Sequence, residues 1–255
     1  MLQKRVIPCL LLHKGGLYKT QKFKKPTYIG DPINAIKIFN EKEVDELMFL
    51  DIDASVENKE PNYKMIEDIA SECFMPLCYG GGVKTIEQMK KIYALGVEKI
   101  SLSSQAVLNP ILIKEAANIF GNQSVIVTID IKKDLWGKGK VFINNGKKNT
   151  KLDPFEFVKK VEALGAGEVV INSVDCDGAM QGFDIELLKQ IKKHTTIPVI
   201  ALGGAGKLEH IKEVFESSNV DAVACGSMFV YQGVLKGVLI SYPPYEKIQE
   251  LLGKK

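Results

Sequence analysis

Short apolar runs alternate with amphipathic stretches along the whole chain. The apolar runs are rich in valine, isoleucine and leucine, which predicts buried parallel strands, and the stretches between them carry helical spacing. The predicted strands are 5–12, 46–52, 76–79, 99–102, 125–131, 168–172, 198–202 and 222–224. Strands and helices that alternate about eight times in about 250 residues indicate an α/β fold, a single (β/α)8 barrel of the TIM type.

Capping residues mark where some of the predicted helices begin. Asp31-Pro32 and Asp153-Pro154 each place a carboxylate before a proline, a typical helix start. One helix is predicted from Asp31 onward, and the others span 62–71, 85–95, 110–120, 154–164, 185–194, 208–217 and 245–252. Two segments lack this pattern: we expect a long basic loop over 14–25, and a polar loop or hairpin over 132–150.

One stretch of the chain occurs twice. Residues 75–104 and 197–227 both read as strand, glycine turn, helix, second strand and a turn of small residues. Pro76 matches Pro198 and Ser104 matches Ser227, at a nearly constant offset. We therefore expect one domain, 1–255, built from two half-barrels of about 1–123 and 124–255. The turns suit phosphate, because glycine and serine let an anion approach backbone N–H groups at a helix start.

Composition and charge exclude several classes of protein. The 255 residues are 45% hydrophobic and 25% charged, a soluble globular composition. The net charge of +3 is small and no basic stripe is interleaved with aromatic residues, so nucleic acid is not an expected partner. No apolar run approaches the roughly 18 residues of a membrane span, so no membrane association is expected.

Cysteine and histidine spacing argues against a metal site. The five cysteines and three histidines show no CxxC and no ligand spacing; they are Cys9, Cys73, Cys78, Cys176, Cys225, His13, His194 and His210. We expect no metal and no cofactor. Residues 1–8 enter a strand pattern without the features of a signal peptide, so we expect a cytoplasmic protein with reduced thiols.

Polar residues at the C-terminal strand ends are the candidates for chemistry, because active sites of such barrels lie there. Asp130 ends an apolar strand where desolvation would raise its pKa, which favours acid–base work; the alternative is a capping or ion-paired carboxylate. Asp51 would either position a substrate hydroxyl or pair with Lys19. Aligning the halves places Leu11 where the second half has Asp130, so a paired-carboxylate mechanism is not available.

Charged residues stand at the opposite ends, where four strands begin. They are Arg5, Glu46, Lys99 and Glu168, two of each sign. A ring of paired charges would plug the barrel floor, where structural contacts are usual. The functional alternative is a gate through which a small molecule enters.

These motifs resemble the cyclase subunit of imidazole glycerol phosphate synthase over essentially the whole chain. The matching segments are 4–7, 30–32, 45–47, 50–52, 80–82, 120–121, 146–150, 165–168 and 203–207. The resemblance implies a two-fold barrel that binds a substrate with a phosphate at each end. It also implies a glutaminase subunit docked on the N-terminal face of the barrel, with ammonia passing up the barrel. The family makes imidazole glycerol phosphate and an aminoimidazole carboxamide ribotide.

The resemblance also implies roles for particular residues. It makes the four floor residues the ammonia gate and gives Asp130 a catalytic role. It assigns one phosphate to Gly82, Ser103 and Ser104, the first cradle, and the other to Gly204, Gly226 and Ser227, the second cradle. Lys19 and Asp51 receive substrate roles, and Ser101 and Asp177, at the same strand ends, complete the predicted substrate site. Asp45, Glu98 and Gln123 are expected rim contacts of the glutaminase.

Three departures from the family lie together at the barrel top. Leu11 replaces an aspartate, Asn172 a threonine and Leu202 a serine. A general acid supplies roughly 10²–10⁴-fold in rate, so the parent cyclisation should be severely impaired. We therefore favour a paralogue that supplies ammonia to a downstream sugar amidotransferase, which converts an acetamido group of a surface sugar into an acetamidino group. The alternatives are a genuine cyclase of histidine biosynthesis and a binding scaffold without chemistry.

Overall fold

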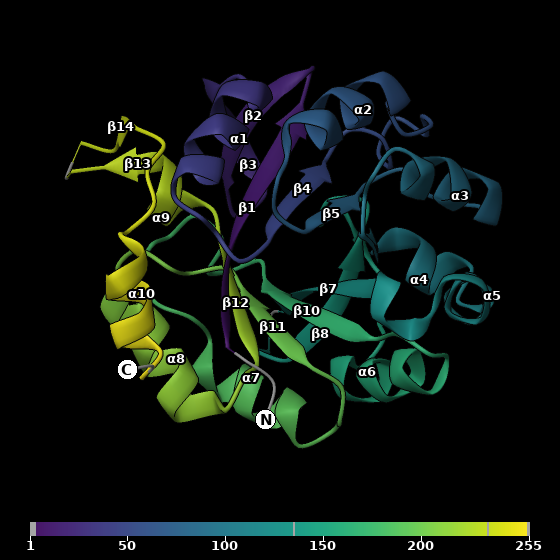
Figure 1. Ribbon diagram of the computed structural model, residues 1–255. Coiled ribbons are helices and arrows are strands. Elements are labelled where there is room, and N and C mark those ends of the chain that lie inside the picture. Colours follow the sequence, from purple (N-terminus) through teal and green to yellow (C-terminus); the bar gives the residue numbers. More distant parts are fainter. Residues whose placement is uncertain (1–3, 135, 234, 254–255) are drawn as a thin grey trace.

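The computed structural model describes residues 4–134, 136–233 and 235–253. The first three and the last two residues of the predicted 1–255 domain, and with them the start of segment 1–8, lie outside the described residues. Within these ranges eight parallel strands form a ring: β1 (Arg5–His13), β4 (Leu47–Asp51), β5 (Leu77–Gly80), β6 (Lys99–Leu102), β7 (Val125–Lys133), β10 (Glu168–Ser173), β11 (Val199–Leu202) and β12 (Ala222–Cys225). The first strand, β1, pairs with both β4 and β12, which closes the ring. The predicted (β/α)8 barrel is confirmed, with strands inside and helices outside (Figure 1).

Helices cover the outside of the ring close to where the pattern predicts them. They are α1 (Pro32–Glu41), α2 (Tyr63–Glu72), α3 (Ile86–Ala94), α5 (Ile111–Phe120), α6 (Pro154–Ala163), α7 (Ile185–Lys192), α8 (Leu208–Ser218) and α10 (Tyr245–Leu251). Both predicted caps form: Asp31 accepts the N–H of Asn34 at 3.0 Å, and Asp153 accepts that of Phe155 at 2.9 Å. The short helices α4 (Ser104–Leu108), η1 (Asn122–Ser124) and α9 (Ser227–Val230) were not predicted.

Antiparallel hairpins extend two of the barrel strands. The expectation of a loop over 14–25 is wrong, because β2 (Gly16–Gln21) pairs with the upper part of β1 and with β3 (Lys24–Gly30). Leu17 is fully buried and the rings of Tyr18 and Tyr28 meet edge to face, so packing holds this basic segment as strands. Of the two alternatives predicted for segment 132–150, a loop or a hairpin, the hairpin forms. Its strand β8 (Gly139–Ile143) pairs with both β7 and β9 (Lys148–Asn149). A further hairpin, not predicted, is β13 (Tyr231–Gln232) with β14 (Gly237–Val238).

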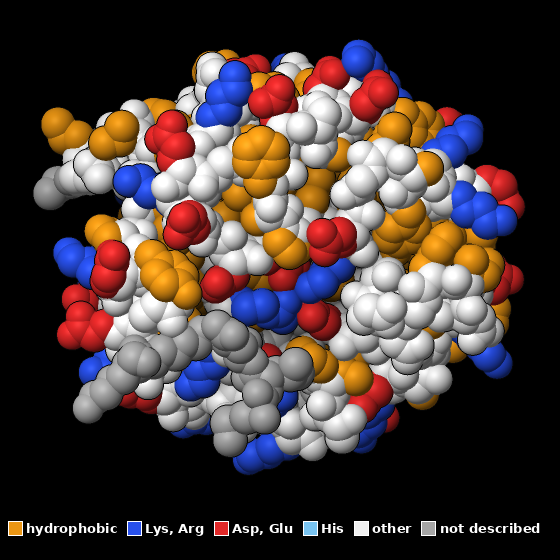
Figure 2. All heavy atoms as spheres, in the orientation of Figure 1, with side chains coloured by type: hydrophobic (Ala, Val, Ile, Leu, Met, Phe, Trp, Pro, Cys, Tyr) orange, Lys and Arg blue, Asp and Glu red, His pale blue; other side chains and the backbone are white. Residues whose placement is uncertain are grey.

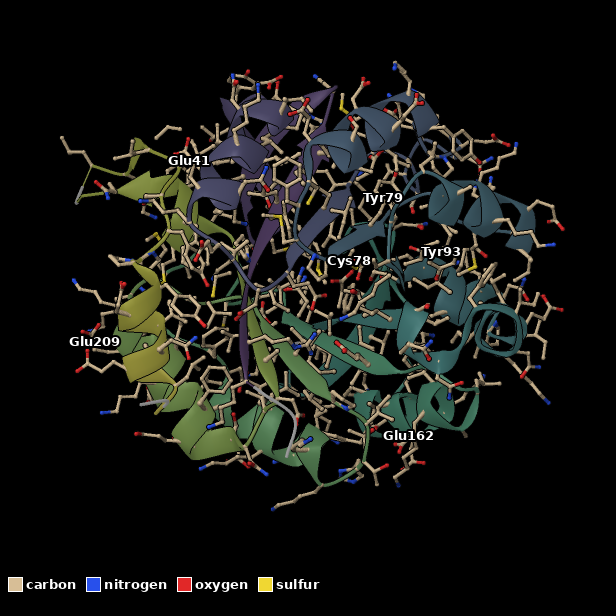
Figure 3. All side chains as sticks on the ribbon, in the orientation of Figure 1. Glu41, Cys78, Tyr79, Tyr93, Glu162 and Glu209 are labelled. Atoms are coloured by element: carbon tan, nitrogen blue, oxygen red, sulfur yellow. The ribbon has the colours of Figure 1, made fainter. Side chains whose placement is uncertain are left out.

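Two apolar clusters form the core, one inside the ring and one between ring and helices. The inner cluster comprises Ile7, Cys9, Met48, Cys78, Ile126, Val170, Ile200, Leu202, Ala222 and Ala224. Side chains alternate along each strand, so Cys78 belongs to the inner cluster while Tyr79 packs in the outer one. Figure 3 shows Cys78 near the barrel axis and Tyr79 farther out. The ring interior is thus packed, and a polar site can form only at its two ends.

The described residues contain no helix long and apolar enough to cross a bilayer. In the same ranges, no three His, Cys, Asp or Glu side chains are placed to hold a metal ion. All five cysteines are free thiols, and burial raises the pKa of Cys9 to about 12 and that of Cys73 to about 11. These two thiols are therefore protonated near neutral pH and poorly nucleophilic.

Candidate active site

The C-terminal ends of the barrel strands surround a cavity of about 120 Å³. All eleven residues predicted for the substrate side line it: Lys19, Asp51, Gly82, Ser101, Ser103, Ser104, Asp130, Asp177, Gly204, Gly226 and Ser227. They come from both halves of the chain, and the closed ring brings them together. Their joint placement is a finding, whereas their individual roles stay predictions.

Asp130 lies deep in this cavity at the end of the apolar part of β7. The residue is 8% exposed, and its carboxylate accepts a hydrogen bond from Asn172 Nδ2 at 2.8 Å and a long one from Ser103 Oγ at 3.4 Å. Burial raises the pKa of Asp130 to about 7; the two hydrogen bonds oppose the rise and nearby Asp177 adds to it. A carboxyl group that titrates near neutral pH is suited to acid–base work.

The alternative reading of Asp130 as an ion-paired carboxylate has no support in the described residues, where its partners are neutral side chains. The suggested pairing of Asp51 with Lys19 is also not what forms. Lys19 Nζ lies 2.8 Å from Asp177 Oδ1, and Asp51 instead accepts the backbone N–H groups of Asp53 and Ala54. The reason is geometric: β2 directs Lys19 toward the loop after β10.

The Lys19–Asp177 pair links the β2–β3 hairpin to the second cradle. Lys19 is 6% exposed and also donates to the carbonyl of Thr20 at 2.9 Å. A Cβ atom added to Gly226 would lie 3.1 Å from Lys19 Cε, so the lysine stem passes directly over that glycine. This arrangement holds a buried cation close to the turn that carries Gly226 and Ser227.

Three leucines also line the cavity, on β1, β4 and β11. Strand pairing places Leu11 beside Leu50 on β1 and β4, and it places Asp130 beside Asn172 on β7 and β10. Leu202, on β11, lies beside Asn172. Leu11 therefore offers no carboxylate at the position that corresponds to Asp130 in the other half, although Asp51 and Asp177 also line the cavity.

The two cradles differ in how far their polar groups are already engaged. In the first, the N–H of Gly82 donates to Ser55 Oγ at 3.3 Å, and Ser104 Oγ accepts the N–H of Asn144 at 3.0 Å. In the second, Ser227 Oγ is buried and has no hydrogen-bond partner among the described residues. Gly204 has φ +120° and abuts the carbonyl of Gly182, so only glycine fits there. The first cradle thus has an engaged backbone N–H at Gly82, whereas Ser227 in the second has no contact to break among the described residues.

The cavity residues missed from sequence include Phe23, Ser55 and Asn145. Phe23 lies at the turn between β2 and β3, and its ring packs against Gly146 of the β8–β9 turn, so hairpins from the two halves meet above the cavity. Asn144 and Asn145 both have positive φ before Gly146, which is the signature of a tight hairpin turn. That asparagine–asparagine–glycine signal was available in the sequence, but the contact with Phe23 was not.

The four charged residues at the barrel floor form one closed network. Arg5 donates to Glu46 at 2.5 Å and to Glu168 at 3.0 Å, and Lys99 contacts the same two carboxylates at 3.0 and 3.3 Å. The Glu46 side chain is 2% exposed and the other three are 14–21% exposed. Burial disfavours the charge of Arg5, but Glu168 and Glu46 outweigh that effect and raise its pKa. On the face seen in Figure 2, basic and acidic side chains gather near the centre.

The unusual pKa of Asp130 predicts a pH-dependent stability difference. Because the pKa lies above its ordinary 3.8, the folded protein binds the proton more tightly, so this group lowers stability as pH rises from about 4 to 7. Asp130→Asn should therefore be close to the wild type in stability at pH 4 and more stable at pH 8, on the order of 2–4 kcal/mol. Urea unfolding at both pH values measures this. An equal difference at the two pH values would contradict the raised pKa.

Comparison with known proteins gives relatives that match this chain along nearly its full length. The family model described as "Histidine biosynthesis protein" matches residues 5–236. A Pseudomonas aeruginosa protein named "Putative imidazole glycerol phosphate synthase subunit hisF2" is 52% identical over 97% of this chain and 99% of its own. A Vibrio vulnificus relative named as subunit hisF3 is 50% identical over 98% and 97%. A Clostridium botulinum protein named "Imidazole glycerol phosphate synthase subunit HisF" is 43% identical over 91% and 92%.

Proposed function

This chain belongs to the histidine biosynthesis protein family, among its HisF-type imidazole glycerol phosphate synthase subunits, and we propose that it delivers ammonia rather than performing the parent cyclisation. The observation that carries the proposal is the contrast between the two ends of the barrel. The floor retains a complete network of Arg5, Glu46, Lys99 and Glu168, while Leu11 and Leu202 put aliphatic side chains into the top cavity.

The floor network suits a gate for ammonia. Ion pairs satisfy one another when shut and can hydrate when open, whereas an apolar plug would not exchange for a polar guest. A glutaminase subunit would dock on this face, with Asp45, Glu98 and Gln123 as rim contacts. Phe74, three residues before the start of β5, is 86% exposed and offers an apolar anchor on the same side. Both complex and reaction would be cytoplasmic.

The top cavity argues against the parent chemistry. Leu11 and Leu202 remove one proton-transfer group and one hydrogen-bonding hydroxyl of the family pattern, while Asp130 is retained. We propose that ammonia leaves the barrel beside Asp130 and passes to a downstream sugar amidotransferase, for conversion of an acetamido into an acetamidino group of a surface glycan. The chain then acts as one subunit of a glutamine amidotransferase assembly.

A genuine cyclase of histidine biosynthesis is the second candidate. It is favoured by Asp130 and by both cradles, which all line the one cavity. Under this alternative Leu11 would be tolerated because another group supplies the missing proton. A second cyclase gene in the same genome, with aspartate at position 11, would make this role superfluous.

Deleting the gene in the cells that carry it separates the two candidates. Under the ammonia-delivery proposal the cells still grow without histidine, and mass spectrometry of their surface glycans shows acetamido groups where acetamidino groups were present. A histidine requirement with unchanged glycans would reverse the assignment. Complementation with the Leu11→Ala variant, which leaves the floor intact, should restore the glycan.

The cradles predict two anion sites of unequal strength. The first cradle must give up the contact of the Gly82 N–H with Ser55 before that N–H can bind phosphate, whereas Ser227 in the second cradle has no contact to break among the described residues. One additional hydrogen bond to a charged ligand corresponds to about tenfold in affinity. Crystals soaked in increasing phosphate should therefore show density beside Gly204 and Ser227 first, and beside Gly82 and Ser104 at higher concentration. Empty cradles at high phosphate would count against both.

A further inference from the structure

Three carboxylates line the barrel-top cavity, and their neighbours satisfy them to different degrees. Asp177 is paired with Lys19 at 2.8 Å, and Asp51 accepts two backbone N–H groups, at 2.9 and 3.0 Å. Asp130 is as deeply buried as Asp177, yet in the described part of the chain its carboxylate has no ion pair. Its one close partner is the neutral amide of Asn172. A buried carboxylate in this situation lacks compensation for its charge.

Asn172 brings a second unsatisfied group to the same place. The residue is 5% exposed, and its Nδ2 atom is used by the hydrogen bond to Asp130. Because that bond fixes the orientation of the amide, the other polar atom of the side chain is Oδ1. This oxygen is buried and has no hydrogen-bond partner among the described residues. Asn172 lines the cavity. Native proteins rarely leave such an acceptor empty, so it points to a ligand that supplies an N–H or O–H group.

We propose that Asp130 and Asn172 together bind a small cation that carries several N–H groups, and that this cation is ammonium held at the exit of the barrel. A cation compensates the carboxylate, and separate N–H groups satisfy the carboxylate and the amide oxygen. A neutral hydroxyl compound could donate a hydrogen bond to the amide oxygen of Asn172, but it would leave the negative charge of Asp130 uncompensated. An anion would be repelled by that charge. Leu202, the neighbour of Asn172 in the strand register, offers no polar group at this point, which favours a small ligand.

The inference rests on the proposed function, because ammonia delivery is what brings ammonium to this position. The site would retain the nitrogen until an acceptor arrives instead of losing it to solution. Transfer then needs neutral ammonia: one N–H bond of ammonium breaks, its proton moves to a carboxylate oxygen of Asp130, and the electron pair stays on nitrogen. Burial, which raises the pKa of Asp130 to about 7, brings the carboxyl closer to ammonium in proton affinity and favours this exchange.

Carbon-13 NMR of the aspartate carboxyl groups in the full chain tests the site. The Asp130 signal, identified with Asp130→Asn, is titrated between pH 5 and 9 in ammonium chloride and in tetramethylammonium chloride of equal concentration. Ammonium bound to the carboxylate lowers the apparent pKa of Asp130, by about one unit when ammonium is tenfold above its Kd. Tetramethylammonium, which has the charge but no N–H group, leaves it unchanged. Asp51, which accepts two backbone N–H groups, and Asp177, which pairs with Lys19, also line the cavity and should not respond.

Variants of Asn172 separate this site from general salt effects. Asn172→Leu, which removes the oxygen, should abolish most of the ammonium-dependent shift. If that variant does not fold, Asn172→Thr restores the relatives' polar residue and should weaken the shift. Ser173→Ala, the next residue on β10 but outside this cavity, should keep it in full. Equal shifts in both salts, or a full shift in Asn172→Leu, would overturn the proposal. The two proposals can fail separately. If ammonium shifts the pKa of Asp130 in full but deletion of the gene leaves the glycans unchanged, the ammonium site stands and ammonia delivery is refuted.

Discussion

Given ammonium salts and the family's bis-phosphate substrate, this protein is expected to form imidazole glycerol phosphate at least about 10²-fold more slowly than a relative with aspartate at position 11. The reason is that Leu11, which pairs with Leu50 on the adjacent strand, stands where the family pattern has an aspartate. Neither leucine can donate or accept a proton. Steady-state turnover of the isolated chain, with a HisF-type relative assayed in parallel, measures the difference.

Restoring the aspartate alone should recover little of that rate. Leu11→Asp would place a carboxyl between Leu50 and the inner cluster, where desolvation keeps it protonated. The matched variant adds Leu202→Ser and Asn172→Thr, which return all three departures to the family pattern, and it should exceed the single variant by about tenfold or more. Robust cyclisation by the unmodified chain, or rescue of a histidine auxotroph, would show that the cavity needs no second proton-transfer group.

Lys99→Ala is expected to uncouple glutamine hydrolysis from product formation while the protein remains folded. Without Lys99, each floor carboxylate still contacts Arg5, at 2.5 Å for Glu46 and 3.0 Å for Glu168. The loss of stability should therefore fall short of the roughly 3–5 kcal/mol that follows when a buried charge loses its only partner. The gap left in the floor lets ammonia escape, so most of the glutamate released would have no matching product.

Glutamate released per product, measured with the melting temperature of the same sample, separates a gate from a structural plug. A structural plug predicts that Lys99→Ala lowers the melting temperature and leaves glutamine hydrolysis coupled to product formation. That outcome would show that the floor network is not a gate. Lys99→Arg, which keeps the charge, should retain most of the coupling. Lys159→Ala, whose exposed pair with Glu156 lies on α6, controls for the loss of a surface lysine.

The barrel and its site follow from local features of the sequence because a repeated strand–turn–helix pattern dictates both. Strand ends converge on one face once the ring is known, so Asp130 and the cradles were predictable from spacing alone. The β2–β3 hairpin was not predictable in this way. Its basic composition favours a loop, and contacts with β1 and β3 hold β2 as a strand. The pairing of Lys19 with Asp177 joins segments far apart in the chain, so no local sequence pattern predicts it.

The pairing of β1 with β12 bears on how this protein is made. Arg5 pairs with Ala222, so the strand that leaves the ribosome first must wait for nearly the whole chain before its last neighbour appears. Until then β1 and the newest strand both present open edges, which other nascent chains can join. Translation that stops before β12 therefore yields a product with two unpaired edges, a target for chaperones and proteases instead of a smaller working barrel.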